Sequence, residues 1–347
     1  NKKILDYSES EGSKQALGLM NRQNRMDAND ANEEEENFDY SNFNPDVLTN
    51  TNNDNIPKNQ GKVNFEIPPD EDFIFNNTLW PEDSKLYGHG YEIISVAISH
   101  DGKLAASGAK SQSEKNSKLF LWDAEKNSLI KKLDGHVLTI VQIEFSYDDK
   151  YILSVSRDRS LCIFEKNGDK DFKLMQMEKE THLRIIWSCA WSFDSKIFLT
   201  GSRDNSVKVW LKINIDGNTK FKEVIYKDFD DAVTSVCVFD RIFNNFYCGV
   251  IGFENGDMHL IKIFVGNEGD DNINIENFDI ENENDSVINN FKMDVVMKFP
   301  KFLSHGMAVK RIKSFTKENV IKIASCSDDH TVRLFELTFE NMENLIK

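Results

Sequence analysis

The stretch from His182 to Trp210 decides the fold and reads H-L-R-I-I-W-S-C-A-W-S-F-D-S-K-I-F-L-T-G-S-R-D-N-S-V-K-V-W. Four of its residues form a set that recurs along the chain: His182, Thr200, Asp204 and Trp210. The same set lies 46 residues earlier, and again near the C-terminus, as His136, Ser154, Asp158 and Phe164 and as His305, Ser325, Asp329 and Phe335. An active site is built once, whereas a repeat keeps its structural residues in every copy. The sets therefore indicate a structural repeat rather than a Ser/His/Asp hydrolase.

Each repeat contains four short segments with the alternation of β-strands. In the third repeat these segments are Ile185–Ser192, Ile197–Gly201, Val207–Lys212 and Phe221–Tyr226. They are rich in β-branched and aromatic residues, and turn residues separate them. Four-stranded units of about 45 residues, with Gly-His near the start and Trp-Asp near the end, are typical of WD-repeat β-propeller blades. We therefore predict an all-β WD-repeat β-propeller with about five blades.

The five predicted blades differ in how well they keep the pattern. The first runs from Gly88-His89 to Trp122-Asp123, while the fourth is degraded, with Phe229, Asn255 and Ile261 in place of His, Asp and Trp. Apolar residues recur at the fourth, seventh and ninth positions after the histidine. These predict inner-strand positions packed between blades, beginning with Ile93, Val96 and Ile98 in the first blade and continuing with Ile140, Ile143 and Phe145 and with Ile186, Cys189 and Trp191.

The residue types of the recurring set fit a buried hydrogen-bond chain. In a tight turn, Asp can accept from turn amides and from the His ring, and Ser or Thr can link His to a Trp indole. Phe164 and Phe335 would retain only packing. We interpret the three sets as structural and expect no catalytic, cofactor-binding or metal-binding residues, because metal ligands must converge and these sets lie a blade apart.

Acidic residues are concentrated in two segments. The formal net charge is −16, of which residues 1–80 contribute −9 and residues 266–294 contribute −8. Residues 1–76 are rich in Asn, Asp and Glu and predict a disordered linker before a propeller at 77–347, and residues 266–290 predict an acidic loop insertion. The nearly neutral remainder argues against direct binding of nucleic acid, which needs clustered Lys and Arg.

Other sequence features exclude several classes of protein. There is no run of 18 apolar residues, no secretory signal, and no P-loop, G-x-G-x-x-G, H-E-x-x-H or G-x-S-x-G motif. The five cysteines contain no C-x-x-C pair, so we expect buried reduced thiols in an intracellular protein. We expect neither membrane association nor enzymatic activity. Because the sequence does not begin with Met, we expect a fragment or an incomplete gene model.

Segments beside the recurring sets resemble one WD-repeat family, which supplies the second subunit of the Elongator complex. The residues that carry the resemblance are N77-T-L-W-P-E82, K85-L-Y-G-H-G-Y-E-I93, S156-R-D-R-S160, R184-I-I-W-S-C-A-W-S-F-D-S-K196, T200-G-S-R-D-N-S-V-K-V-W210 and A324-S-C-S-D-D-H-T-V332. The resemblance covers about residues 77–337. It implies that the blades are part of a seven-bladed propeller, with two further blades upstream of Asn1, and that the five form an open arc or a strained ring.

The resemblance also implies a function. Members of that family are noncatalytic scaffolds of a complex that modifies the wobble uridine of tRNA and is linked to transcription. We therefore expect other Elongator subunits as protein partners, no cofactor, and a cytoplasmic location with a nuclear pool. Two alternatives remain open: a WD-repeat adaptor of another assembly, such as a signalling or ubiquitin-ligase complex, and a propeller enzyme.

Candidate partner contacts lie where the turns and inner-strand starts meet on one face of a propeller. The residues at these positions are Tyr91, Arg157, Arg184, Arg203 and Asp328. Arg and Tyr are enriched among the residues that dominate interface energies. Ordinary solvated turn residues would have the same composition, so the sequence alone leaves both interpretations open.

Overall fold

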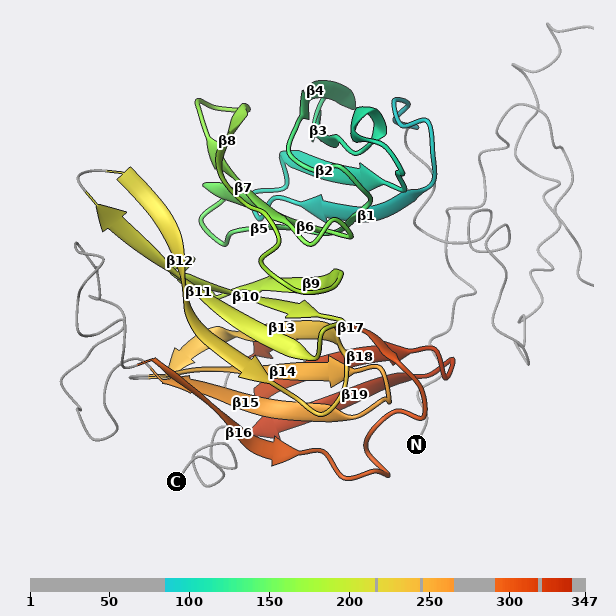
Figure 1. Cartoon of the computed structure of the whole chain (residues 1–347), viewed down its shortest axis with the longest axis vertical. Helices are drawn as coiled ribbons and strands as arrows, with labels where there is room; N and C mark the ends of the chain where they lie inside the picture. The colour runs from blue at the N-terminus through green and yellow to red at the C-terminus, as the bar shows by residue number, and fades with distance from the viewer. Residues whose placement is uncertain (1–84, 216–217, 244–245, 265–290, 318–319, 339–347) are drawn as a thin grey trace, which may run out of the picture. The chain divides into compact units, whose positions relative to one another are not determined.

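The computed structural model describes residues 85–215, 218–243, 246–264, 291–317 and 320–338. Nineteen strands form five antiparallel sheets that follow one another along the described chain, each a meander of sequential strands (Figure 1). The prediction of an all-β propeller with about five blades is confirmed. The predicted linker at 1–76 and the predicted acidic insertion at 266–290 lie outside the described residues.

The first three sheets are complete four-stranded blades. Blade 1 contains β1 (Ile93–Ile98), β2 (Leu104–Ala109), β3 (Leu119–Asp123) and β4 (Ser128–Leu133). Blade 2 contains β5 (Ile140–Phe145), β6 (Tyr151–Ser156), β7 (Leu161–Lys166) and β8 (Phe172–Glu178). Blade 3 contains β9 (Ile186–Trp191), β10 (Ile197–Ser202), β11 (Ser206–Ile215) and β12 (Asn218–Asp228). The first three strands of blade 3 begin within one residue of the predicted segments. β12 begins three residues before the predicted Phe221, and β11 extends past Lys212, because the two strands form one long hairpin.

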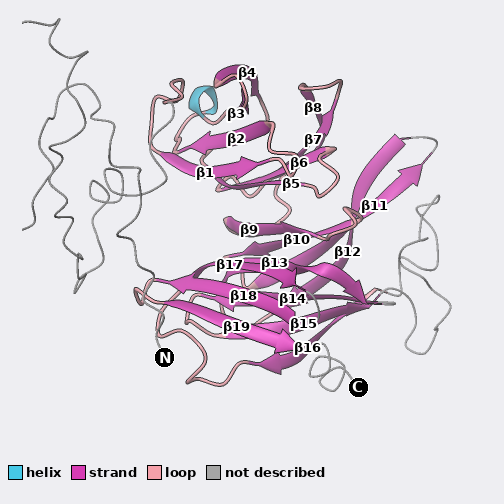
Figure 2. Ribbon diagram, turned by 180° about the vertical axis from the view of Figure 1, so that it is seen from behind, coloured by secondary structure: helices cyan, strands magenta, loops and turns pink. Residues whose placement is uncertain are grey.

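The last two sheets follow the same order. Blade 4 contains β13 (Val233–Phe243), β14 (Phe246–Phe253), β15 (Met258–Phe264) and β16 (Lys292–Lys298). Blade 5 contains β17 (Val309–Lys317), β18 (Val320–Ser327) and β19 (Val332–Thr338) within the described residues. Figure 2 shows that strands dominate the described chain. The short 3₁₀ turn at Glu114–Asn116 is the one helical segment in that part, and no described helix is long and apolar enough to cross a membrane.

The hydrophobic core is divided into four clusters, each built from two consecutive blades. Blades 2 and 3 share a cluster that contains Tyr151, Trp191 and Phe221, whose rings meet edge to face or stacked within 6.2 Å of one another. The remaining clusters join blades 1 and 2, blades 3 and 4, and blades 4 and 5. A blade therefore buries its apolar side chains against its neighbours rather than within itself, as expected for repeat architectures.

Neighbouring inner strands are also joined by polar bonds. The Gln142 side chain on β5 donates to the carbonyl of Cys189 on β9 at 2.8 Å and accepts from its amide at 3.2 Å. Ser188 and Ser235 accept in the same way from amides of the next inner strand, those of Val236 and Ile312. These bonds satisfy buried polar groups at the seams and fix the register between blades.

The prediction that the apolar residues of the inner strand of blade 1 are packed between blades is wrong. Ile93, Val96 and Ile98 are 52%, 61% and 63% exposed, whereas the corresponding residues of blades 2 and 3 are buried. These positions pack against the blade that precedes them, and in the described chain β1 belongs to the first blade. Blade 5 exposes apolar residues on β19, its last described strand, where Val332 and Leu334 are 69% and 78% exposed. The described blades thus end in two uncovered apolar faces.

All five cysteines are free thiols, and four of them are buried. Burial raises the pKa of Cys237 to about 11 and that of Cys248 to about 12. A thiol with such a raised pKa stays protonated at neutral pH and is a poor nucleophile. These two cysteines therefore act as small apolar residues of the core.

Candidate functional site

In blade 3 the recurring set forms a continuous buried hydrogen-bond chain. Nδ1 of His182 lies 3.1 Å from Oδ2 of Asp204, and Nε2 lies 2.9 Å from the hydroxyl of Thr200. The Trp210 indole donates to the same hydroxyl at 3.2 Å, while Asp204 accepts from the amide of Leu183 at 2.8 Å. The chain thus ties the start of the inner strand β9, the second strand and the third strand to one turn.

Blades 2 and 5 bring their sets together in the same way, but without the terminal indole. Nε2 of His136 lies 2.8 Å from the Ser154 hydroxyl and Nδ1 lies 3.4 Å from Asp158. Nε2 of His305 lies 2.7 Å from the Ser325 hydroxyl and Nδ1 lies 3.0 Å from Asp329. Phe164 and Phe335 contribute packing alone: Phe164 is buried, and Phe335 meets Phe299 edge to face at 5.3 Å.

The buried charges of blade 2 change the protonation of its set. Burial by itself lowers the pKa of His136, but neighbouring Cys162 and Asp158 raise it to about 9. Burial raises the pKa of Asp158, but its hydrogen bond and charge interaction with His136 outweigh this and hold the pKa well below its usual range. The pKa of Asp204 is lowered in the same way by His182 and Ser206, which also outweigh burial. The carboxylates are therefore ionised acceptors at neutral pH.

Blade 1 contains a further set of this kind, which was not predicted from the recurring spacing. Nε2 of His89 lies 2.7 Å from the Ser107 hydroxyl, and that hydroxyl accepts from the Trp122 indole at 2.7 Å. The step from histidine to serine is 18 residues, as in blades 2 and 3, and could have revealed the pair. The step from Ser107 to Trp122 is five residues longer than in those blades, because the 3₁₀ turn lies in the connection.

Blade 4 replaces the polar set by aromatic packing. Phe229 occupies the histidine position and lies 5.4 Å from Phe253 and 6.1 Å from His259, measured between ring centroids. The buried Nδ1 of His259 has no hydrogen-bond partner among the described residues. Burial and Lys298 lower the pKa of His259, so its ring stays neutral, which reduces the cost of the missing partner.

The position of the recurring histidine, occupied by Phe229 in blade 4, and the turn after the second strand lie at the same end of each blade, which we call the histidine face. Five residues on this face occupy equivalent positions, one in each blade. The backbone amide of each donates to the carbonyl of the residue three positions after the histidine position of the same blade. These residues are Lys110, Arg157, Arg203, Glu254 and Asp328. Their charges divide the face: blades 1 to 3 present basic residues, and blades 4 and 5 present acidic ones.

The structure places all five candidate contact residues on the histidine face. Tyr91 is 59% exposed and precedes β1, and Arg184 holds the equivalent position before β9. Arg157, Arg184 and Arg203 are exposed, and none has a side-chain hydrogen bond or ion pair within the described residues. The equivalent charges of blades 1 and 5 are neutralised, because Lys110 pairs with Glu92 at 3.0 Å and Asp328 with Lys310 at 2.7 Å.

Exposed apolar side chains accompany these arginines. Val137 and Leu183, each directly after a histidine of the recurring set, are 48% and 80% exposed. Arginines beside apolar side chains can contact acidic and apolar groups of a protein partner together. By contrast, the histidines of the recurring sets are almost fully buried and held by neighbours, which leaves them no access to a substrate. Among the described residues, no group of three or more His, Cys, Asp or Glu is placed to hold a metal ion.

Comparisons with known proteins agree with this geometry. The family model "WD domain, G-beta repeat" matches residues 81–123, 127–165 and 175–210. The chain is 34% identical over 285 residues to Elongator complex protein 2 of Arabidopsis thaliana, which covers 78% of this chain and 31% of that protein. It is 32% identical to the Dictyostelium discoideum protein of the same name, over 86% of this chain and 31% of that one. The Saccharomyces cerevisiae protein of that name is 37% identical over 58% of this chain and 26% of its own length. The chain thus spans about a third or less of these curated relatives.

Proposed function

Because this chain is a WD-repeat β-propeller related to Elongator complex protein 2, we propose that it is a noncatalytic scaffold of the Elongator complex. In this role it holds other subunits in place by protein contacts and so supports modification of the tRNA wobble uridine and Elongator-linked transcription. The proposal places it in the cytoplasm with a nuclear pool. It needs no cofactor and no direct contact with nucleic acid.

One observation carries the proposal beyond the family resemblance. Arg157, Arg184 and Arg203 project from the histidine face of blades 2 and 3 without side-chain partners in the described part of the chain. An unpaired guanidinium can form a bidentate pair with a carboxylate of another protein without first breaking an internal ion pair. These three residues, together with Tyr91 and Asp328, are the proposed contacts with other subunits.

Charge reversal at two of these arginines tests the proposal. Arg157→Glu with Arg203→Glu in the full-length protein should reduce co-purification of the other Elongator subunits about tenfold or more, because reversed charges repel acidic partner groups. The readout is affinity purification with quantitative mass spectrometry. Thermal melting of the purified variant should remain near that of the unchanged protein.

A matched control changes the net charge equally at the opposite ends of the blades. Lys103→Glu with Lys150→Glu alters two exposed turn lysines there and should leave co-purification unchanged. Equal recovery of the subunits with both double variants would refute the role of the arginines. Recovery of a different assembly with the unchanged protein, and no Elongator subunits, would favour an adaptor of another complex.

A further inference from the structure

Three blades place an aspartate carboxylate at the same point of the histidine face. Oδ2 of that aspartate accepts from the amide of the residue that follows the histidine and lies close to the histidine Nδ1. The amide bonds are 2.8, 2.8 and 2.9 Å, for Val137 to Asp158, Leu183 to Asp204 and Gly306 to Asp329. The fold therefore has a defined carboxylate position in blades 2, 3 and 5, with two N–H groups directed at it.

Blade 1 has the rest of this arrangement but lacks the carboxylate. Ser111 stands four residues after Ser107, where the other blades have aspartate four residues after Ser or Thr. The Ser111 hydroxyl is used inside its own loop, since it donates to the carbonyl of Ser113 at 2.7 Å and accepts from the amide of Ser113 at 3.1 Å. The Ser111 amide is held by Thr139 of blade 2. Ser111 therefore does not replace the missing acceptor.

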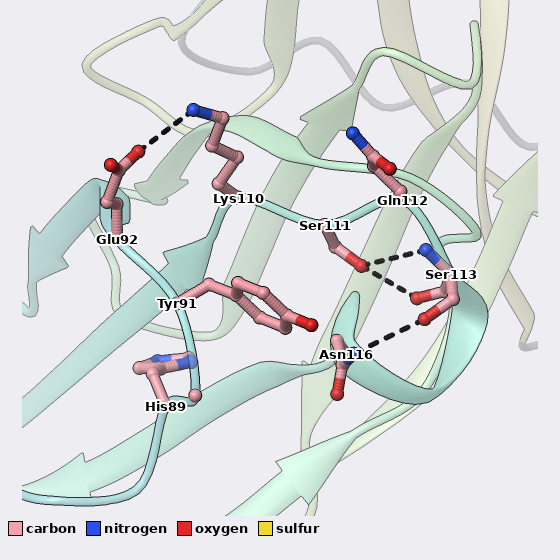
Figure 3. A pocket seen from close by; sticks show the side chains of 9 residues that line it. His89, Tyr91, Glu92, Lys110, Ser111, Gln112, Ser113 and Asn116 are labelled. Atoms are coloured by element: carbon pink, nitrogen blue, oxygen red, sulfur yellow. Dashed lines mark hydrogen bonds and ion pairs between the residues drawn. The ribbon is translucent and has the colours of Figure 1, made fainter.

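A pocket of ≈ 680 Å³ opens where the carboxylate is missing, and His89, Gly90, Tyr91, Lys110, Ser111 and Asn116 are among its lining residues (Figure 3). Figure 3 shows the Tyr91 side chain extending from the segment after His89 towards the loop that carries Asn116. Within the described residues, the Gly90 amide and Nδ1 of His89 have no hydrogen-bond partner. These are the two groups that contact aspartate in the other blades.

The hydrogen-bond chain of blade 1 sets the tautomer of His89. The Trp122 indole can only donate, so it occupies an acceptor position on the Ser107 oxygen. Among the described residues the Ser107 hydroxyl contacts no other acceptor, so its proton is directed to Nε2 of His89, 2.7 Å away, and Nε2 accepts. A neutral imidazole with Nε2 as acceptor carries its proton on Nδ1. The pocket therefore presents two N–H donors at the carboxylate position.

We propose that this pocket binds a carboxylate group from outside the blade, which completes the fourth position of the blade 1 set. The carboxylate accepts from the Gly90 amide and from Nδ1–H of His89, as the internal aspartates do. Lys110 at the rim adds a positive charge, while Glu92, paired with it at 3.0 Å, disfavours a ligand with a higher negative charge. The pocket has room for a peptide side chain and its neighbours, so the carboxylate can come from an acidic protein segment or from a small free acid.

The test uses the 347-residue chain with ¹³C-labelled histidine and sodium acetate as the probe at constant ionic strength. Acetate should shift the His89 ring signals in NMR spectra with a saturable dependence, and neutral acetamide should not. A His89→Gln variant assigns the signals. No saturable shift with acetate, or an equal shift with acetamide, would overturn the proposal.

Two variants at the pocket sharpen the test. Ser111→Asp supplies the carboxylate from within the chain and should weaken the acetate response about tenfold or more, whereas Ser111→Ala should leave it within about twofold. Glu92→Gln removes an exposed negative charge from the rim and should tighten acetate binding about two- to fivefold, the range expected of an exposed charge. If Ser111→Asp fails to fold, unchanged acetate affinity in Glu92→Gln overturns the proposal by itself.

Two capped peptides identify the source of the carboxylate. A tripeptide with a central aspartate is compared with its asparagine counterpart and with acetate. Tighter binding of the aspartate peptide than of acetate supports a protein segment, and equal binding supports a small acid. Equal binding of the two peptides contradicts the proposal. The test contains no Elongator subunit, so its result is independent of the proposed scaffold function.

Discussion

At the scale of residues, the recurring set works because no member is left unsatisfied. Asp204 has two roles: one oxygen contacts Nδ1 of His182 and accepts from the Leu183 amide, while the other accepts from the Ser206 amide and hydroxyl. Buried polar chains are stable when every donor and acceptor is matched, and costly when one partner is removed. The sets in blades 2, 3 and 5 thus stabilise the fold by joining the strands and the turn of each blade.

Loss of Asp204 should be costly for this reason. We expect Asp204→Ala to lower the free energy of unfolding by about 3 kcal/mol, because His182 is left buried without its carboxylate and the Leu183 amide loses its acceptor. Urea unfolding and thermal melting measure the loss. Asp230→Ala, at a side chain that is 97% exposed, should change stability by less than about 0.5 kcal/mol. A melting curve of Asp204→Ala that overlays that of the unchanged protein would rule out a stabilising role of Asp204.

The raised pKa of His136 predicts a stability loss at alkaline pH. Its folded pKa of about 9 lies above the ordinary 6.5, so its contribution is complete below pH 6.5 and is lost as the pH rises through about 9. The lowered pKa of Asp158 acts in the opposite range: its contribution is present above the ordinary 3.8 and is lost only in stronger acid. Of these two groups, only His136 changes its contribution to the stability between pH 6.5 and 9.5.

Asp158→Asn separates this effect from other titrations. The variant lacks one of the charges that raise the His136 pKa, so its melting temperature should fall less between pH 6.5 and 9.5 than that of the unchanged protein. A difference of a few degrees is expected, since ~1 kcal/mol corresponds to ~2–4 °C in a domain of this size. Parallel melting curves across this pH range in the two proteins would exclude His136 as the source.

At the scale of elements, the sequence predicted the regular blades well and the irregular ones less well. The strand alternation and the spacing of the sets were sufficient for blades 2 and 3. The spacing missed the set of blade 1, because a 3₁₀ turn lengthens the connection to Trp122 without moving His89 or Ser107. The loss of the carboxylate at Ser111 was visible in the sequence, but its consequence, a pocket with two N–H donors, depends on loop geometry that spacing does not encode.

The second strands of three blades carry a glycine at the seam with the next blade. These glycines are Gly108, Gly201 and Gly252, and a Cβ on each would lie within 2.6–2.9 Å of an apolar side chain on the following inner strand. In blade 2, Val155 occupies this position and is fully buried. The side-chain volume at this position is therefore matched to the local distance between blades.

Gly201→Ala should destabilise the seam between blades 3 and 4. The added methyl would meet Val233 at 2.6 Å and Val236 at 2.8 Å, and such overpacking costs about 1–3 kcal/mol. Gly90→Ala is the matched control, because no atom lies within 4 Å of its added methyl. Equal unfolding free energies for these two variants in urea would show that the seam can relax without cost.

At the scale of the whole molecule, the described blades bury their seams but leave two terminal faces uncovered. Val96 and Ile98 on β1, and Val332 and Leu334 on β19, are more than half exposed. Residue patterns place Val96 and Ile98 correctly on an inner strand. They do not show whether a neighbouring blade covers them, because burial depends on the adjacent blade rather than on the strand itself. Uncovered apolar faces of this kind promote association between molecules.

The isolated chain should therefore associate as its concentration rises, and Val96→Glu with Leu334→Glu should weaken this association about tenfold or more. Burial of one such side chain contributes ~1.5–3 kcal/mol, and ~1.4 kcal/mol corresponds to a tenfold change in affinity. Light scattering coupled to size-exclusion chromatography over a range of concentrations measures the mass. Val137→Glu with Leu183→Glu makes the same chemical change on the histidine face and should leave the mass profile unaltered. If the control pair reduces association as strongly as the pair on β1 and β19, the prediction is wrong. The molecules would then associate through the histidine face rather than through the terminal blade faces.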